Sequence, residues 1–171
     1  MLKIFNSMTP FFEDSYKEIN VREYAKIAKV TPPTASSILK ELEKEGLLQS
    51  REFLNSRLYR AKRESPLFMD ISRPYFRQKL ESLASYLAQS TNYALIILFG
   101  SLSKAEAKIS SDIDIFINAK PKDIPVEKFE KELHRKIELH FNSSLKNKAL
   151  MENIKKGVVL YGDMNGLEKL Q

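Results

Sequence analysis

Apolar positions in the first third of the chain recur every three or four residues, which is the spacing of one helix face. Residues 21–29 show this spacing directly after Asn20, a good helix-capping residue, and predict a short helix. Residues 34–45 predict a second helix that Gly46 ends. The prolines in residues 30–33 separate the two, so the pattern predicts a helix-turn-helix.

The next residues show the pattern of two short strands. Residues 47–53 and 57–61 flank a turn at 54–56, which predicts a β-hairpin. A hairpin that follows a helix-turn-helix resembles the winged-helix regulators, in which the second helix enters the major groove and the hairpin contacts the DNA backbone. We therefore assign residues 1–65 to a winged helix-turn-helix domain. The alternative is that this domain is a protein-interaction module.

Polar and basic side chains of the second helix and the hairpin region are the candidates for DNA contact. The candidate residues are Thr34, Ser36, Ser37, Lys40, Arg51, Arg57, Arg60, Lys62 and Arg63. In the hairpin region only Glu52 opposes the basic side chains, whereas the second helix itself also carries glutamates and is not basic. Because a winged helix reads double-stranded DNA best as a dimer, we expect a homodimer if the domain recognises an operator.

The remaining residues predict a second domain behind a helical connection. Residues 66–90 predict one or two connecting helices, with a break near residues 72–74 where Pro74 stands. Residues 91–171 mix strands, expected at 94–99, 111–117, 136–141 and 157–162, with helices, expected at 126–136 and 147–156. The chain is thus expected to be α/β (α+β), with a short mixed sheet flanked by helices in its second domain.

Candidate chemistry lies where the first two of these strands meet. Gly100 and Ser101 form a turn at the end of a buried strand, where backbone N–H groups can approach an anion. Asp112 and Asp114 lie two residues apart on the next strand, so their carboxylates share one face. Such a pair repels itself unless a cation or a proton relieves it, and oxygen ligands suit Mg²⁺. Alternatively, the two aspartates simply occupy a solvated strand face.

The spacing of these groups resembles a known signature. Gly100-Ser101, nine residues and then Ser111-Asp112-Ile113-Asp114-Ile115 are similar to the motif of minimal nucleotidyltransferases of the DNA polymerase beta superfamily. The resemblance covers residues 92–162, including a closing strand at 157–162. It implies that Asp112, Asp114 and a third acid, Glu138, bind metal and carry catalysis. It also implies that Gly100, Ser101, Lys104 and Ser111 bind the nucleotide.

The resemblance implies a function as well. It points to transfer of a nucleoside monophosphate, AMP from ATP, to a hydroxyl of a partner protein with two Mg²⁺ ions. Minimal nucleotidyltransferases often act as antitoxins of HEPN-type toxins, and here the DNA-binding domain would add autoregulation. The sequence differs from the family pattern at Ala105, where a glycine is usual, and at Glu138, where an aspartate is usual. These differences favour the alternative, a DNA-binding transcriptional regulator whose inactive nucleotidyltransferase domain senses nucleotide or holds a partner. The intact Gly100, Ser101, Asp112 and Asp114 count against it.

Composition and charge limit the kinds of site and the cellular location that we expect for this protein. The 171 residues include no cysteine, which excludes disulfides, and neither of the 2 histidines has a partner at a metal-ligand spacing. The formal net charge of +6 suits a polyanionic partner. No apolar run approaches the roughly 18 residues that span a bilayer, and the N-terminus lacks the features of a signal peptide. We therefore expect a cytoplasmic protein that contacts no membrane.

Overall fold

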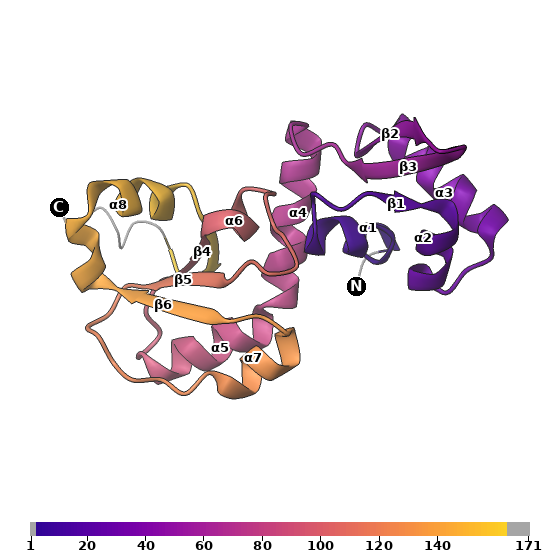
Figure 1. Ribbon diagram of the computed structural model, residues 1–171. Coiled ribbons are helices and arrows are strands. Elements are labelled where there is room, and N and C mark those ends of the chain that lie inside the picture. The colour runs from indigo at the N-terminus through magenta and orange to yellow at the C-terminus, as the bar shows by residue number, and fades with distance from the viewer. Residues whose placement is uncertain (1–2, 164–171) are drawn as a thin grey trace. The chain divides into compact units, whose positions relative to one another are not determined.

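The computed structural model describes residues 3–163 and shows two compact units along the chain (Figure 1). The first unit comprises Met1–Tyr75 together with Ala105–Ile109, and the second comprises Phe76–Lys104 and Ser110–Gln171. The ends of the two predicted domains, residues 1–2 and 164–171, lie outside the described residues. The division into residues 1–65, 66–90 and 91–171 stays a prediction.

The first unit is built from helices and a small antiparallel sheet. Its elements are α1 (Lys3–Glu13), β1 (Ile19–Asn20), α2 (Val21–Ala28), α3 (Pro32–Lys44), β2 (Leu48–Phe53), β3 (Ser56–Ala61) and the beginning of α4 (Pro66–Lys79). The sheet has the order β1-β3-β2, and β2 and β3 pair along their whole length. The predicted hairpin is therefore confirmed, and so is the cap of α2, where the Asn20 side chain accepts a hydrogen bond from the Glu23 amide.

The start of α3 corrects one expectation. The prolines were expected to separate the two helices, but Pro32 and Pro33 are the first residues of α3, and Thr31 caps it. Proline suits the first helical turn because its fixed φ is helical and its missing N–H would have no partner there. The separation lies earlier, at Lys29, which ends α2 with a left-handed φ of 54°.

Aromatic side chains form much of the core of the first unit. The Phe12 ring contacts the rings of Phe5, Phe68 and Tyr75, with centroids 4.8 to 6.4 Å apart. The predicted break in the connecting helices is misplaced, because α4 continues through Pro74 and ends at Lys79. A proline removes one helical hydrogen bond, but buried neighbours such as Phe68 and Tyr75 can hold the helix together. The next helix, α5 (Glu81–Ser90), begins after Leu80.

The second unit contains the predicted mixed sheet. Its elements after α5 are β4 (Ile96–Phe99), α6 (Gly100–Ser103), β5 (Ile113–Ile117), α7 (Glu127–Leu133), β6 (Ile137–Phe141), a 3-10 helix η1 (Asn142–Lys146), α8 (Lys148–Lys155) and β7 (Val158–Tyr161). The strand order is β6-β5-β4-β7. β5 and β6 are parallel, and the other two pairs are antiparallel.

Several boundaries in the second unit differ from the sequence prediction: the helix expected at 126–136 already ends at Leu133, and two differences concern the candidate site. Gly100 and Ser101 form the first turn of α6 rather than an isolated turn. The strand expected from residue 111 begins at Ile113, whose amide donates to the Lys136 carbonyl as the ladder with the β6 region starts. Asp112 therefore precedes the strand.

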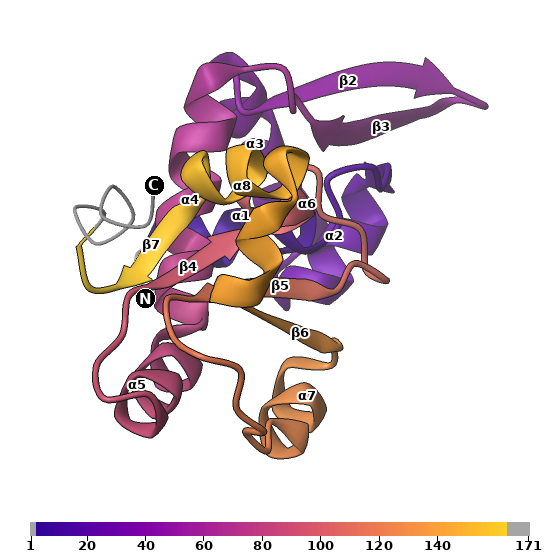
Figure 2. The same cartoon turned by 90° about the vertical axis from the view of Figure 1, so that its left-hand side faces the viewer.

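Helices cover both faces of this sheet, as Figures 1 and 2 show, with α5 and α7 on one side and α8 on the other. Between α8 and the sheet lies a core of Leu95, Ile97, Phe99, Phe116 and, from α8 itself, Ile154. Since side chains alternate along a strand, Ile113, Ile115 and Ile117 point to the opposite face. No described helix has the length and apolar character needed to cross a membrane.

Candidate functional site

Gly100 holds the end of β4 directly against the carboxyl group of Asp114. Gly100 has a φ of +72°, which is the left-handed region where a side chain is strained. A Cβ built there would lie 2.9 Å from Cγ of Asp114 and would overlap its Oδ2. Both the backbone conformation and the close approach of Asp114 therefore require glycine at this position. The Gly-Ser part of the sequence motif thus contacts the part that contains the aspartates.

Strand register brings further polar side chains to the same place. Asp114 of β5 lies opposite Phe99 of β4 and Glu138 of β6. Two residues along, His140 lies opposite Phe116. Because residues paired across strands share a face, Asp114, Glu138 and His140 all lie on the face that carries α8 and its apolar core.

Asp114, Glu138 and His140 form a compact group of potential metal ligands, which we call the acid–histidine cluster. One ligand atom from each lies within 4.8 Å of the others. Nε2 of His140 is 3.7 Å from Oε2 of Glu138. The two oxygen donors and one nitrogen donor fit a divalent cation, so the residues present are compatible with the metal that nucleotidyltransferases use.

The electrostatics of Asp114 favour a bound cation. Burial raises the pKa of its carboxyl group, and the negative charges of Glu138 and Asp112 raise this pKa further. His140 and Lys104 act in the opposite direction but do not compensate. A half-buried carboxylate with too little positive charge around it gains stability when a cation binds beside it.

Two of the other predicted nucleotide- and metal-binding residues, Asp112 and Lys104, are close enough to Asp114 for their charges to act on it. Asp112 is exposed and is not one of the three clustered residues, although its charge acts on Asp114. Nζ of Lys104 donates to Oδ1 of Asn153 at 2.9 Å, which ties α6 to α8. Ser101 is half-buried, directly after Gly100.

Ser111 and Ala105 belong to the segment between α6 and β5. The backbone carbonyl of Ser111 accepts a 2.6 Å hydrogen bond from the guanidinium of Arg135, which is buried. Ala105 is buried and has a φ of 60°, the conformation that a glycine would adopt at little cost. The chain thus takes a left-handed turn at this position in spite of the alanine.

The predicted DNA-contacting residues lie in the first unit. On α3, Thr34, Ser37 and Lys40 are exposed and Ser36 is half-buried. In and after the hairpin, Arg51, Arg57, Arg60 and Lys62 are exposed, and Arg63 is half-buried.

Glu52 was expected to be the only acidic side chain near the basic residues of the hairpin, and this expectation is wrong. Arg51 makes a bidentate pair with Glu18, with Nε to Oε1 at 2.8 Å, and Arg57 pairs with Glu52 at 3.3 Å. Arg63 lies 3.8 Å above the ring of Tyr16. Glu18 is distant in sequence from the hairpin, and the β1–β3 pairing nearby brings it to Arg51.

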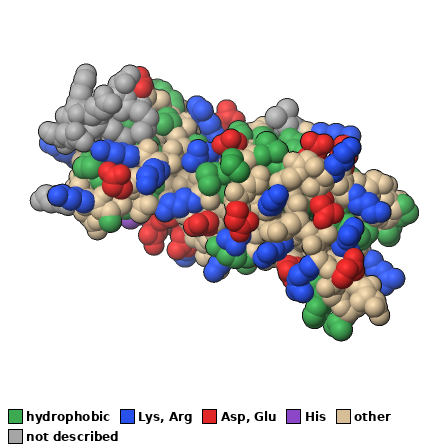
Figure 3. All heavy atoms as spheres, turned by 90° about the horizontal axis from the view of Figure 1, so that it is seen from above, with side chains coloured by type: hydrophobic (Ala, Val, Ile, Leu, Met, Phe, Trp, Pro, Cys, Tyr) green, Lys and Arg blue, Asp and Glu red, His purple; other side chains and the backbone are tan. Residues whose placement is uncertain are grey.

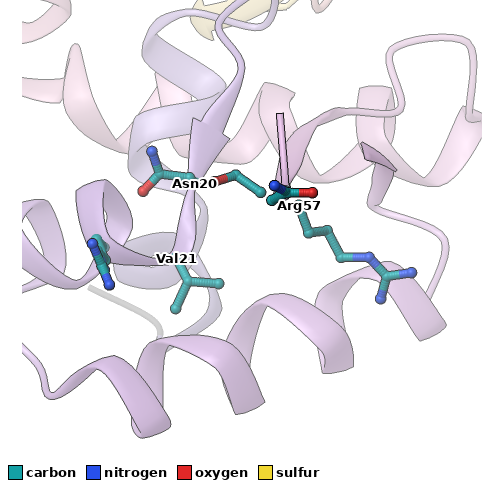
Figure 4. A pocket seen from close by; sticks show the side chains of 6 residues that line it. Asn20, Val21 and Arg57 are labelled. Carbon is teal, nitrogen blue, oxygen red and sulfur yellow. The ribbon is translucent and has the colours of Figure 1, made fainter. Parts of the chain in front are cut away.

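A polar pocket of about 490 Å³ lies beside the tip of the hairpin, lined by Asn20, Val21, Arg22, Asn55, Ser56 and Arg57. Figure 4 shows the Arg57 side chain extending away from Asn20 and Val21. On the face seen in Figure 3, Lys and Arg are interspersed with Asp and Glu rather than gathered into one patch.

Sequence reasoning missed His140. Its position two residues after Glu138 on a predicted strand was a usable signal, because alternate residues of a strand share a face. The sequence did not show that β6 would lie parallel to β5, in register with Asp114.

Comparison with known proteins supports the resemblance in the second unit. Residues 81–165 match the family model described as Polymerase beta, Nucleotidyltransferase. No curated protein and no solved structure matches the chain. The match and the meeting of Gly100 with Asp114 lead to one conclusion: residues 81–165 are similar to the nucleotidyltransferase domains of the polymerase beta superfamily.

Proposed function

We propose that this protein transfers a nucleoside monophosphate, AMP from ATP, to a hydroxyl group of a partner protein. The observation that carries the proposal is the contact of Gly100 with Asp114 within a domain of nucleotidyltransferase type. By the same resemblance, we propose that the partner is a HEPN-type toxin and that the protein acts as its antitoxin.

In this proposal Asp112, Asp114 and Glu138 hold Mg²⁺, with two ions expected. Metal held by these residues would supply positive charge that stabilises the triphosphate during attack on the α-phosphate and departure of pyrophosphate. Gly100 and Ser101 would bind the triphosphate with backbone N–H groups and a hydroxyl, and Lys104 and Ser111 would add further contacts. Glu138 is exposed and is our candidate to accept the proton of the attacking hydroxyl.

Calorimetric titration of a non-hydrolysable ATP analogue tests the nucleotide site. We expect binding that requires Mg²⁺ and falls more than about tenfold in Asp114→Asn, because the substitution removes a charged ligand. The matched control is Asp123→Asn, which alters an exposed loop aspartate of the same unit. Equal binding by Asp114→Asn and the control would remove the basis of the proposal.

Transfer itself is tested with a HEPN-type protein as acceptor. After incubation with ATP and Mg²⁺, mass spectrometry should find an adenylyl group on a hydroxyl side chain of the acceptor. Asp112→Asn and Asp114→Asn should both abolish this product. If nucleotide binds but no product forms with any acceptor, the alternative of an inactive nucleotide-sensing domain is favoured.

We also propose that the first unit is a winged helix-turn-helix that binds double-stranded DNA. The support is the confirmed hairpin, the exposed polar side chains of α3 and the exposed Arg60, which faces Gln49 across the hairpin. A homodimer would present two such units to an operator.

Fluorescence anisotropy with a mixed-sequence duplex tests DNA binding across a range of salt concentrations. Each phosphate contact contributes about 0.9 to the slope of log affinity against log salt. Arg60→Gln should therefore reduce this slope by about one, whereas Lys131→Gln on α7 should leave it unchanged. Binding without a salt dependence, or equal effects of both variants, would favour the protein-interaction alternative.

A further inference from the structure

We propose that His140 is a metal ligand of the nucleotidyltransferase site and gives it a preference for Mn²⁺ or Co²⁺ over Mg²⁺. This inference rests on the proposed function, since it concerns the metal of the same site. It assigns a ligand beyond the three carboxylates expected from the sequence.

The spacing of the donor atoms agrees with a shared ion. Two ligands at about 2.1 Å from one metal ion lie about 3.0 Å apart when they are neighbours in octahedral coordination. The separation of 3.7 Å between Nε2 of His140 and Oε2 of Glu138 is longer than that value and longer than a hydrogen bond, so the two atoms must approach by less than about 1 Å to share an ion. Asp114 completes a group whose donor atoms all lie within 4.8 Å, so small side-chain rotations would close it on one ion.

The imidazole of His140 is held in place, but its buried Nε2 atom makes no hydrogen bond to a described residue. The ring packs edge-on against Phe99, with centroids 5.1 Å apart and an angle of 71° between the planes. Phe99 thus contacts one side of the imidazole ring of His140, while Nε2 of His140 lies near the Glu138 carboxylate. A buried nitrogen without a hydrogen bond, beside two acids, is available to coordinate a cation.

The nitrogen donor changes which cation the site prefers. Mg²⁺ selects oxygen ligands and keeps much of its water, whereas imidazole is a good ligand for first-row transition metals. We therefore expect a site with two carboxylates and one imidazole to bind Mn²⁺ and Co²⁺ more tightly than Mg²⁺. We infer that His140 distinguishes this site from one built from carboxylates alone.

Direct metal titration of the full chain tests, without an activity assay, whether His140 binds metal and favours Mn²⁺ over Mg²⁺. Binding of Mn²⁺ is followed by loss of the electron paramagnetic resonance signal of the free ion, and binding of Mg²⁺ by calorimetry. We expect wild type to bind Mn²⁺ at least about tenfold more tightly than Mg²⁺. His140→Gln should weaken Mn²⁺ about tenfold or more and change Mg²⁺ by less than about threefold, because the amide oxygen of Gln replaces a nitrogen.

The control variant is His134→Gln, which changes the other histidine, exposed at the end of α7. Equal losses of Mn²⁺ affinity in both histidine variants, or equal losses of Mn²⁺ and Mg²⁺ in His140→Gln, would overturn the assignment. If Asp114→Asn abolishes metal binding and His140→Gln does not, only the role of His140 fails. If Asp114→Asn binds both metals as wild type does, the metal site of the proposed function fails as well.

Discussion

Replacement of Gly100 by alanine tests the contact on which the site depends. The φ of +72° would be imposed on a residue with a side chain, at a cost of about 1–2 kcal/mol. The new methyl group would also overlap the carboxyl of Asp114, and forcing such a group into a packed region costs about 1–3 kcal/mol. We therefore expect Gly100→Ala to lower the free energy of unfolding by about 2–5 kcal/mol.

The matched control is Gly46→Ala. Gly46 has nearly the same φ, +76°, but an added Cβ would meet nothing within 4 Å. It should therefore cost only the conformational part, about 1–2 kcal/mol. Urea denaturation, with separate analysis of the transitions of the two units if they differ, measures both changes.

Metal binding provides the second measurement on these variants. Gly100→Ala displaces the Asp114 carboxyl and should weaken divalent metal binding at least about tenfold, whereas Gly46→Ala should leave it unchanged. If Gly100→Ala is no more destabilising than Gly46→Ala and binds metal normally, Gly100 does not define the position of Asp114. The description of the site would then be wrong.

Three further variants test other parts of the structure. Asp114→Asn should raise the melting temperature at pH 7 in metal-free buffer: burial raises the folded-state pKa above the ordinary 3.8, so stability falls as pH rises through the raised value. A melting series from pH 4 to 8 should show this fall in wild type and a smaller one in Asp114→Asn. Asn20→Ala should cost about 1 kcal/mol in urea denaturation by removing the cap of α2, and an unchanged midpoint would contradict that role. Gly157→Ala should destabilise the second unit by about 1–3 kcal/mol, because the added Cβ would lie 2.5 Å from the Leu98 carbonyl oxygen; a neutral result would show that β4 can move.

The sequence by itself determined the local elements and the main chemical motif. Capping by Asn20, the hairpin and the strands of the mixed sheet follow from short-range patterns that the chain carries within a few residues. Gly100 and Asp114 were recognised because their spacing resembles the motif of minimal nucleotidyltransferases. Their roles in metal and nucleotide binding remain proposals.

Only the tertiary structure decided which distant side chains meet. Pro74 stays inside α4 although the local signal predicts a break, because packing of the surrounding helix outweighs one lost hydrogen bond. Arg51 pairs with Glu18, and His140 joins Asp114, through strand pairings that no local pattern specifies. Local propensity acts over a few residues, whereas register between strands sets contacts across the whole unit, and the candidate metal site depends on that register.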